Sequence, residues 1–291
     1  MDPMFTLLWQ QYRTWADTAR HLKEQNGRWK RNVLILTVVG TALATLGPHA
    51  GNALVARVLP MIGAAALAVA TFFGKELLDA AHEERWTRAR AAAEAFKSEA
   101  CKYLVHIPPY DTEDRATKLK ARMDELAKVI IKGQPDDIPE DQSKKNLPTQ
   151  AWTIDDYLVK RLDDQVTFYT NKAAAHTAWM NRGRTISLTL GCTSVLLGAV
   201  TGATPEGATL SAAVLGLVTT AGGSIGAYFQ AGHYQTIALK YRETAQALRA
   251  LKAEFTSPST PQSSADLVTS AETIMQAENA GWLTEMTTVK T

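Results

Sequence analysis

The pattern of apolar and charged positions is dominated by residues 185–230, a stretch whose one charge is Glu206, beside Pro205. This charge divides the stretch into two uncharged arms, residues 185–205 and 207–230. Each arm is close to the roughly 20 residues that a helix needs to cross a bilayer, and a helical pair satisfies its own backbone hydrogen bonds there. The pattern therefore predicts a transmembrane hairpin. The alternative is a buried helical pair in a soluble core, but such helices normally carry a polar outer stripe.

A second hairpin is predicted nearer the N-terminus. Residues 33–47 and 58–74 are apolar, residues 48–52 form a polar turn, and Pro60 fits the first turn of the second helix. The first arm has about fifteen strictly apolar residues, so flanking cations or turn residues must extend its span. We therefore predict four transmembrane helices, at about residues 32–48, 57–74, 184–204 and 207–229.

Polar helices are predicted on both sides of each hairpin, at residues 5–31, 75–103, 155–181 and 233–255. The segments that begin at Arg90 and Arg242 align without gaps as R-x-x-A-[E/Q]-A-[F/L]-[K/R]. Helix, hairpin and helix therefore occur twice, which indicates an internal duplication. Alanine-rich helices also resemble one another by chance, and this is the alternative explanation.

The fold class that follows is an all-α membrane protein, built from two repeats of cytoplasmic helix, transmembrane hairpin and cytoplasmic helix, with a long cytoplasmic helical bundle. We assign residues 1–107 to the first repeat and residues 151–256 to the second. Residues 108–150 hold a helix at 112–132, which Thr112 is placed to cap, and a linker at 133–150. Residues 257–291 hold a second linker and a short helix at 265–282.

Cations gather at the base of both hairpins and are sparse at the tips. Because cytoplasmic loops carry the excess of Lys and Arg, we expect both termini and the long polar helices in the cytoplasm. In an oligomer these cations would ring the mouth of a pore; the alternative is that they only anchor the helix ends to anionic headgroups. The pore-mouth candidates are Lys30, Arg31, Arg182 and Arg184.

Composition and motifs argue against several other functions. The net charge of +2 is too small to indicate a nucleic-acid partner, and the distant Cys101 and Cys192 form no disulfide framework. No glycine-rich phosphate loop opens a helix, and the six histidines lack metal-ligand spacing. Adjacent acids such as Asp155 and Asp156 point to different helix faces, as solvated charges do. We expect no catalytic residue, no metal, no cofactor and no enzymatic activity.

Small and hydroxyl-bearing residues form stripes along three of the predicted spans. Such stripes allow helix backbones to approach closely, or they line an aqueous pore where hydroxyls replace the hydration of an ion. No formal charge lies within a span, so proton coupling and voltage sensing have no carrier. The pore-lining candidates are Thr37, Thr41, Thr45, Ser187, Gly191, Ser194, Gly216, Thr219 and Gly223.

Four residues at strict four-residue spacing form a ridge on the helix that precedes the second hairpin: Tyr157, Arg161, Gln165 and Tyr169. A ridge of this kind packs against another helix or lines a polar seam. The ridge, the uncharged hairpin, Tyr241-Arg242 and a late motif of Glu272, Glu278 and Trp282 together resemble the SLATT domains. These are bacterial two-transmembrane modules named for their association with nucleotide-synthesising and nucleotide-sensing proteins. The resemblance covers about residues 155–282, and the first half is similar to a diverged companion copy.

The resemblance implies a pore-forming effector in conflict systems that answers a nucleotide or another danger signal. The chain shows no recognisable sensor or synthetase domain, so the resemblance leaves its trigger undefined. We therefore expect a homo-oligomeric pore or ion-channel subunit in a lipid bilayer, gated through its cytoplasmic helices by a nucleotide or a soluble protein. The alternative is a non-conducting, membrane-anchored scaffold that docks a soluble signalling partner.

Overall fold

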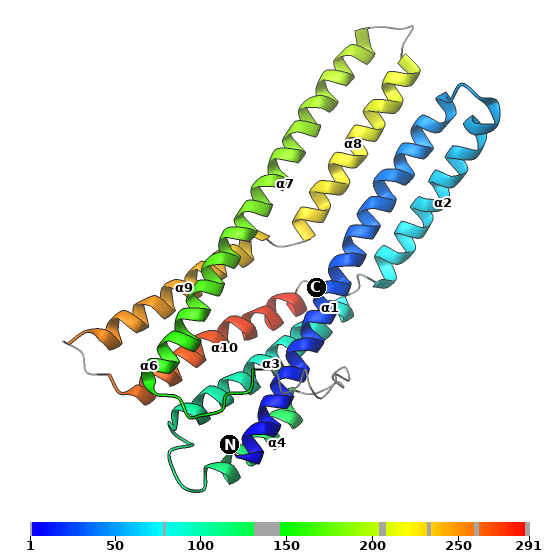
Figure 1. Cartoon of the computed structure of the whole chain (residues 1–291). Helices are drawn as coiled ribbons and strands as arrows, with labels where there is room; N and C mark the ends of the chain where they lie inside the picture. The colour runs from blue at the N-terminus through cyan, green and yellow to red at the C-terminus, as the bar shows by residue number, and fades with distance from the viewer. Residues whose placement is uncertain are drawn as a thin grey trace. The chain divides into compact units, whose positions relative to one another are not determined.

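The computed structural model describes residues 2–77, 80–130, 146–203, 208–231, 234–258 and 262–288. Every regular element in these ranges is helical, which confirms the all-α fold with four helical stretches long and apolar enough to cross a membrane (Figure 1). Most of the linker predicted at residues 133–150, and Glu206, lie outside the described residues. The elements are α1 (Pro3–Leu46), η1 (Gly47–His49), α2 (Ala53–Leu77), α3 (Ala80–Val105), α4 (Arg115–Ile130), α6 (Ile154–Tyr157), η2 (Leu158–Asp163), α7 (Asp164–Ala203), α8 (Ala208–Ala231), α9 (Tyr234–Thr256) and α10 (Ser264–Thr288).

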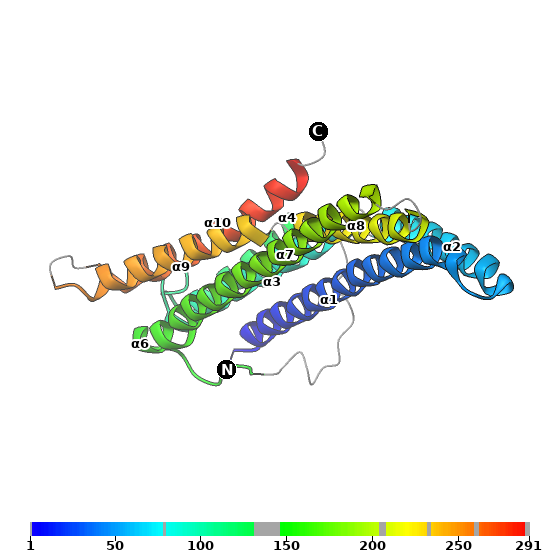
Figure 2. The ribbon, with the colours of Figure 1, turned by 90° about the horizontal axis from the view of Figure 1, so that it is seen from above.

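Helices α1 and α7 each continue from a polar half into an apolar half without a break (Figures 1 and 2). The sequence predicted separate polar and membrane helices here, and the structure corrects this because no proline interrupts either junction. At 1.5 Å per residue, the 44 residues of α1 measure about 66 Å, roughly twice the hydrocarbon thickness of a bilayer. About half of the helix must therefore lie outside the membrane.

Helix α2 begins earlier than the apolar run indicated, because Asn52 caps it. The Asn52 Oδ1 atom accepts hydrogen bonds from the backbone N–H groups of Leu54 at 2.9 Å and Val55 at 3.3 Å. The predicted place of Pro60 in a first turn is therefore wrong, since the residue lies inside the helix. Neighbouring groups can compensate for the missing N–H of a proline in a membrane helix.

Two further helix starts differ from the sequence prediction. Helix α4 begins at Arg115 rather than residue 112, and the Thr112 hydroxyl bonds to Asp114 instead of capping the helix. Helix α10 is longer than the short helix expected at residues 265–282. The Ser263 Oγ atom accepts from the Asp266 N–H at 3.1 Å and donates to the Asp266 carboxylate at 2.7 Å, which fixes the start of α10.

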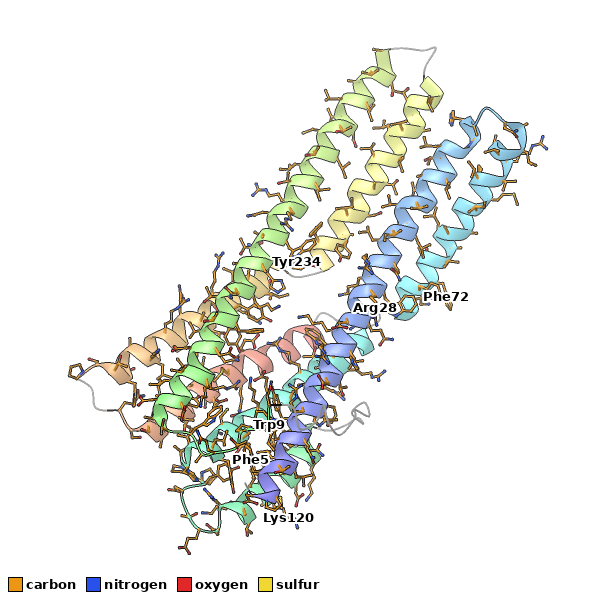
Figure 3. The ribbon with its side chains drawn as sticks, in the orientation of Figure 1. Phe5, Trp9, Arg28, Phe72, Lys120 and Tyr234 are labelled. Atoms are coloured by element: carbon orange, nitrogen blue, oxygen red, sulfur yellow. The ribbon has the colours of Figure 1, made fainter. Side chains whose placement is uncertain are left out.

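The chain forms two compact units, each of which takes residues from both repeats. The first unit comprises residues 1–24, 80–173 and 239–291, and the second comprises residues 25–79 and 174–238. In the first unit, Phe5 and Trp9 of α1 are buried in an apolar core with α3 and α4 (Figure 3). The ring of Phe5 stacks on that of Tyr103 with centroids 5.5 Å apart. The buried residues of α1 in this core lie on one face of the helix, as in an amphipathic helix.

A second part of the same unit is formed by α10, which packs along α3, together with α6, η2, α7 and α9. The two segments that align in sequence bury the same positions in this unit. In each segment the third, fourth and seventh residues are buried, and these are Ala92, Ala93 and Phe96 in α3, and Thr244, Ala245 and Leu248 in α9. Equal burial at aligned positions supports the duplication, because chance similarity in composition does not fix which face is covered.

The second unit contains the two membrane hairpins, α1 with α2 and α7 with α8. In the first hairpin the backbones touch: a Cβ on Gly63 would lie 2.5 Å from the Ala44 nitrogen and 2.6 Å from the Gly40 oxygen. Only glycine at residue 63 allows this close approach, as at other small-residue crossings in membranes. In the second hairpin the contact is looser in the middle of α8. An added Cβ on Gly222 would lie 3.4 Å from the Leu190 side chain of α7, which is an ordinary contact distance.

An aromatic pair lies at the base of each hairpin. The rings of Trp29 and Phe73 are 5.5 Å apart in the first, and those of Trp179 and Phe229 are 6.3 Å apart in the second. Tryptophan and phenylalanine at a helix end suit the interface between hydrocarbon and headgroups. The pairs therefore mark equivalent levels in the two hairpins.

Candidate functional site

The ridge Tyr157, Arg161, Gln165 and Tyr169 lies on the buried face of one continuous helical segment, which runs from α6 through η2 into α7. A capping box between Thr153 and Asp156 fixes its start. The η2 segment is a π-helical turn, a form often found at functional sites, and it carries Arg161. All four ridge side chains are buried within the first unit.

The centre of the ridge is an ion pair between Arg161 and Glu272 of α10, and each side chain is 1 % exposed. The guanidinium Nε and Nη2 atoms donate to the two carboxylate oxygens at 3.0 and 2.9 Å, a bidentate arrangement. The Tyr157 hydroxyl also donates to Glu272, at 3.0 Å. Breaking such a buried pair by removing one partner costs about 3–5 kcal/mol, because a charge is left uncompensated.

A second ion pair lies between Arg90 of α3 and Glu278 of α10. One guanidinium nitrogen, Nη2, donates to both carboxylate oxygens, at 2.8 and 3.2 Å, and the Tyr169 hydroxyl donates to the same carboxylate at 3.5 Å. The Arg90 guanidinium also donates to the Tyr241 hydroxyl of α9, at 3.5 Å. Four helical segments thus meet through two charged pairs.

Glu94 of α3 connects the two pairs. Its carboxylate accepts from the Arg161 Nη2 atom at 3.4 Å, and it lies one helical turn beyond Arg90 on α3. Arg161 therefore faces two carboxylates, that of Glu272, which is buried, and that of Glu94, which is partly exposed. We call Arg90, Glu94, Arg161, Glu272 and Glu278 the ionic cluster.

The Arg161–Glu272 pair keeps its charges at neutral pH. Burial lowers the pKa of the Arg161 guanidinium, but the charge of Glu272, the hydrogen bonds to Glu272 and the charge of Glu94 together outweigh burial and set this pKa well above its ordinary value. Burial raises the pKa of the Glu272 carboxyl, and the Arg161 charge with the hydrogen bonds from Arg161 and Tyr157 more than offsets this, so the pKa lies below 4.5. Burial and Glu272 together raise the pKa of the Tyr157 hydroxyl. These three groups therefore offer no proton exchange near pH 7, and they act as a structural connection.

The described part of the chain contains no group of three or more His, Cys, Asp or Glu side chains placed to hold a metal ion. Cys101 is buried near the cluster, where burial raises its thiol pKa to about 12 and the charges of Arg161 and Glu272 act on it in opposite directions. A thiol with this pKa stays protonated at neutral pH and is a poor nucleophile.

Two family models match the chain, one over each hairpin and its flanking helices. SMODS and SLOG-associating 2TM effector domain 3 matches residues 9–152, and SMODS and SLOG-associating 2TM effector domain 1 matches residues 157–282. The chain belongs to the SLATT family. It carries two SLATT domains in tandem and is a multi-pass membrane protein. No curated protein and no solved structure gives a match to the chain.

The domain limits show what the ionic cluster joins. Arg90 and Glu94 belong to the first SLATT domain, whereas Arg161, Glu272 and Glu278 belong to the second. The pairs Arg90–Glu278 and Arg161–Glu94 therefore cross between the domains, and the pair Arg161–Glu272 lies within the second.

The predicted pore-lining threonines of the first SLATT domain bond to their own helix. The hydroxyls of Thr37, Thr41 and Thr45 each donate to the carbonyl four residues earlier, at 2.8 Å. Thr41 is buried, and its neighbour Gly40 contacts Gly63 of α2. A hydroxyl that donates to its own backbone still presents acceptor lone pairs to the groups around it.

The candidates of the second SLATT domain divide into two sets. Ser187, Ser194 and Thr219 lie between α7 and α8: the Ser194 and Thr219 hydroxyls are 3.4 Å apart, and a Cβ on Gly226 would lie 3.9 Å from the Ser187 hydroxyl. The second set faces open space, because a Cβ would meet nothing within 4 Å, and consists of Gly191, Gly216 and Gly223.

The pore-mouth candidates lie at the hairpin bases, on α1 and α7. The Arg182 guanidinium carbon lies 5.6 Å from the centre of the Trp179 ring, a cation–π contact at the level of the aromatic pair. Arg31 and Arg184 are exposed, and Lys30 is partly exposed. The contact with Trp179 suits an anchoring role for Arg182.

The sequence left three members of the ionic cluster and its surroundings out of the candidate site: Arg90, Glu94 and Tyr241. Arg90 entered only through the alignment with Arg242, and that partner is exposed on α9. The alignment of the two repeats therefore does not predict that Arg90 is buried in an ion pair. Of the late motif, Glu272 and Glu278 are placed in the cluster, while the side chain of Trp282 lies outside the described part of the structure.

Proposed function

We propose that this SLATT protein is a subunit of a homo-oligomeric pore or ion channel in the inner membrane of a bacterium. Both termini lie in the cytoplasm, the cytoplasmic helices gate the pore, and a nucleotide or a soluble protein provides the trigger in a defence response. The proposal assigns the protein no catalytic activity and no cofactor. It rests on the following differences between its two hairpins.

The observation that carries the proposal is the open small-residue face of the second hairpin. At Gly191, Gly216 and Gly223 an added Cβ would meet no atom within 4 Å. In the first hairpin, by contrast, the space beside Gly40 is occupied by α2 and the space beside Gly63 is occupied by α1. Helices in lipid associate mainly by close packing at small residues, because lipid is as apolar as leucine. The open faces are therefore suited to a helix from another copy.

Several copies are also what a pore requires. Four spans in one chain enclose too little space for an aqueous path, and closed symmetric assemblies are the common solution. Closely opposed hydroxyls such as Ser194 and Thr219 can then replace part of the hydration of an ion. The continuous helices α1 and α7 supply a mechanical connection to the cytoplasmic bundle, because each contributes residues to both compact units.

The experiment is to replace Gly216 or Gly223 with Leu in the full-length protein, and to measure both oligomeric state and conductance. Gly27→Leu is the matched control, because this glycine of α1 also has open space around it but lies before the predicted span. We expect Gly216→Leu and Gly223→Leu to fold and insert, to shift toward smaller species in native electrophoresis, and to lose current in planar bilayers. Gly27→Leu should assemble and conduct like the unmodified protein.

Two outcomes would contradict the proposal. If both span variants assemble and conduct like the unmodified protein, the open face is covered by lipid. If the unmodified protein is oligomeric but never conducts when tested with candidate nucleotides, low pH and membrane potential, the protein is a membrane-anchored scaffold for a soluble partner.

A further inference from the structure

The C-terminal helix α10 contributes both buried glutamates of the ionic cluster. Glu278 binds Arg90 of the first SLATT domain, and Glu272 binds Arg161 of the second, at the start of the second domain's long helix. Helix α10 is not part of any of the four stretches long and apolar enough to span a membrane, whereas α1, α7 and α9 are. It is therefore a separate element that contacts both domains.

The chemistry of these contacts differs from that of an ordinary core. Among the residues of α10 whose side chains the structure describes, the buried apolar ones are of small or moderate size, namely Leu267, Val268, Ala271 and Met275. Burying an ion pair costs so much desolvation that well-packed apolar residues of similar volume are often equally stable or more stable. Two buried pairs on one helix are thus a poor means of adding stability. Their best-attested uses are to set register and to act as a switch.

We propose that α10 is a releasable latch. When it is docked, Glu272 and Glu278 hold α3 of the first domain against η2 and α7 of the second. When it leaves, Arg90 and Arg161 lose these partners, and the two domains are held together less firmly, through Arg161–Glu94 and Arg90–Tyr241. Because α7 continues into the membrane hairpin, release changes the state of the pore. This last step rests on the function proposed above, whereas the latch itself does not.

The chain contains its own reporter of the latch. Cys101 of α3 is 1 % exposed, and the charges of Arg161 and Glu272 act on its thiol. The thiol is therefore shielded from reagents in the docked state and becomes reactive when α10 leaves. The other cysteine, Cys192, is exposed on α7, and a Cys192→Ser background removes it.

The experiment compares Glu272→Gln and Glu278→Gln in this background, as full-length protein in liposomes. The control is Glu243→Gln, which changes an exposed glutamate of α9. We expect maleimide to label Cys101 about tenfold faster or more in both cluster variants and at the unmodified rate in the control. Hydrogen exchange should speed up in α10, while the amides of α1 and α4 around Phe5 and Leu119 keep their protection.

A charge exchange and a measurement on the unmodified protein cover the case in which a variant does not fold. Arg90→Glu combined with Glu278→Arg should restore slow labelling relative to either single change. In the unmodified protein, α10 should open in hydrogen exchange as a unit of its own, before the α1–α4 core. Exchange of α10 together with that core, in one cooperative event, would overturn the latch.

Labelling and ion flux separate the two proposals. Unchanged labelling of Cys101 in both cluster variants overturns the latch. Faster labelling without flux in any variant or in the unmodified protein leaves the latch in place and contradicts the pore. Faster labelling with flux equal to that of a conducting unmodified protein shows that the latch opens without controlling the pore, and overturns its regulatory role.

Discussion

Replacing Gly63 with Ala tests the direct backbone contact in the first hairpin. The new Cβ would lie 2.5 Å from the Ala44 nitrogen and 2.6 Å from the Gly40 oxygen. Both atoms belong to the backbone of α1, so neither can rotate away as a side chain would. The helices must therefore move apart by about 1 Å to regain an ordinary van der Waals distance.

The expected magnitude follows from two opposing effects. Forcing an extra methyl group into a packed contact costs about 1–3 kcal/mol. Alanine returns about 0.5–1 kcal/mol because it loses less conformational freedom than glycine in a helix. Taking the middle of each range, the net change in the free energy of unfolding is a loss of about 1 kcal/mol. Gly27→Ala, on helix α1, is the matched control, since its Cβ meets nothing within 4 Å and only the favourable effect remains.

The measurement is unfolding of the full-length protein in mild detergent micelles by increasing amounts of a denaturing detergent, followed by circular dichroism. Gly63→Ala should unfold at a lower fraction of denaturing detergent than the unmodified protein, and Gly27→Ala at the same fraction or a higher one. Equal stability of Gly63→Ala and the unmodified protein would refute the contact. So would an equal loss in both variants, because it would show that glycine matters for helix flexibility rather than for packing.

Three further predictions address charge and orientation. The pKa of Glu272 in the folded protein lies below its ordinary 4.5, so its contribution to stability is complete above about pH 4.5 and is lost as the pH falls through the folded pKa. The melting temperature should therefore drop in this acidic range, and it should drop less steeply in Glu272→Gln. A cysteine at Asn52 should react with an impermeant reagent from outside the cell and one at Ser143 should not; the reverse pattern would invert the assigned orientation. Arg184→Glu should shift the reversal potential in a salt gradient if residue 184 lines a pore mouth, whereas an altered insertion alone would identify an anchor.

The membrane segments could be predicted from sequence because the bilayer acts on local composition. Apolar length, flanking cations and a short polar turn are sufficient to predict a span, and the four apolar helices agree with that prediction. The helix boundaries differ from those predicted, because they depend on local hydrogen bonds. The early start of α2 depends on a hydrogen bond from Asn52, and the unbroken passage of α1 into the membrane depends on the absence of a breaker rather than on any positive signal.

The sequence predicts the ridge and the late glutamates, but it does not predict which helices they contact. Four-residue spacing established that Tyr157, Arg161, Gln165 and Tyr169 share one face, because helical period fixes which residues lie together. It could not establish that this face meets α10, nor that Arg90 meets Glu278, 188 positions later in the chain. Periodicity within a helix carries no information about the partner helix.

The sequence by itself therefore determined the all-α class, the four membrane helices and the duplication, since each is set by composition or spacing along the chain. The tertiary structure decided which glycines touch a neighbour and which charges are paired. Gly63 and Gly216 lie in equally apolar helices. An added Cβ at Gly63 would collide with the backbone of α1, whereas one at Gly216 would meet no atom within 4 Å. The difference arises from how the helices cross, and side-chain contacts between distant segments exist only after those crossings are set.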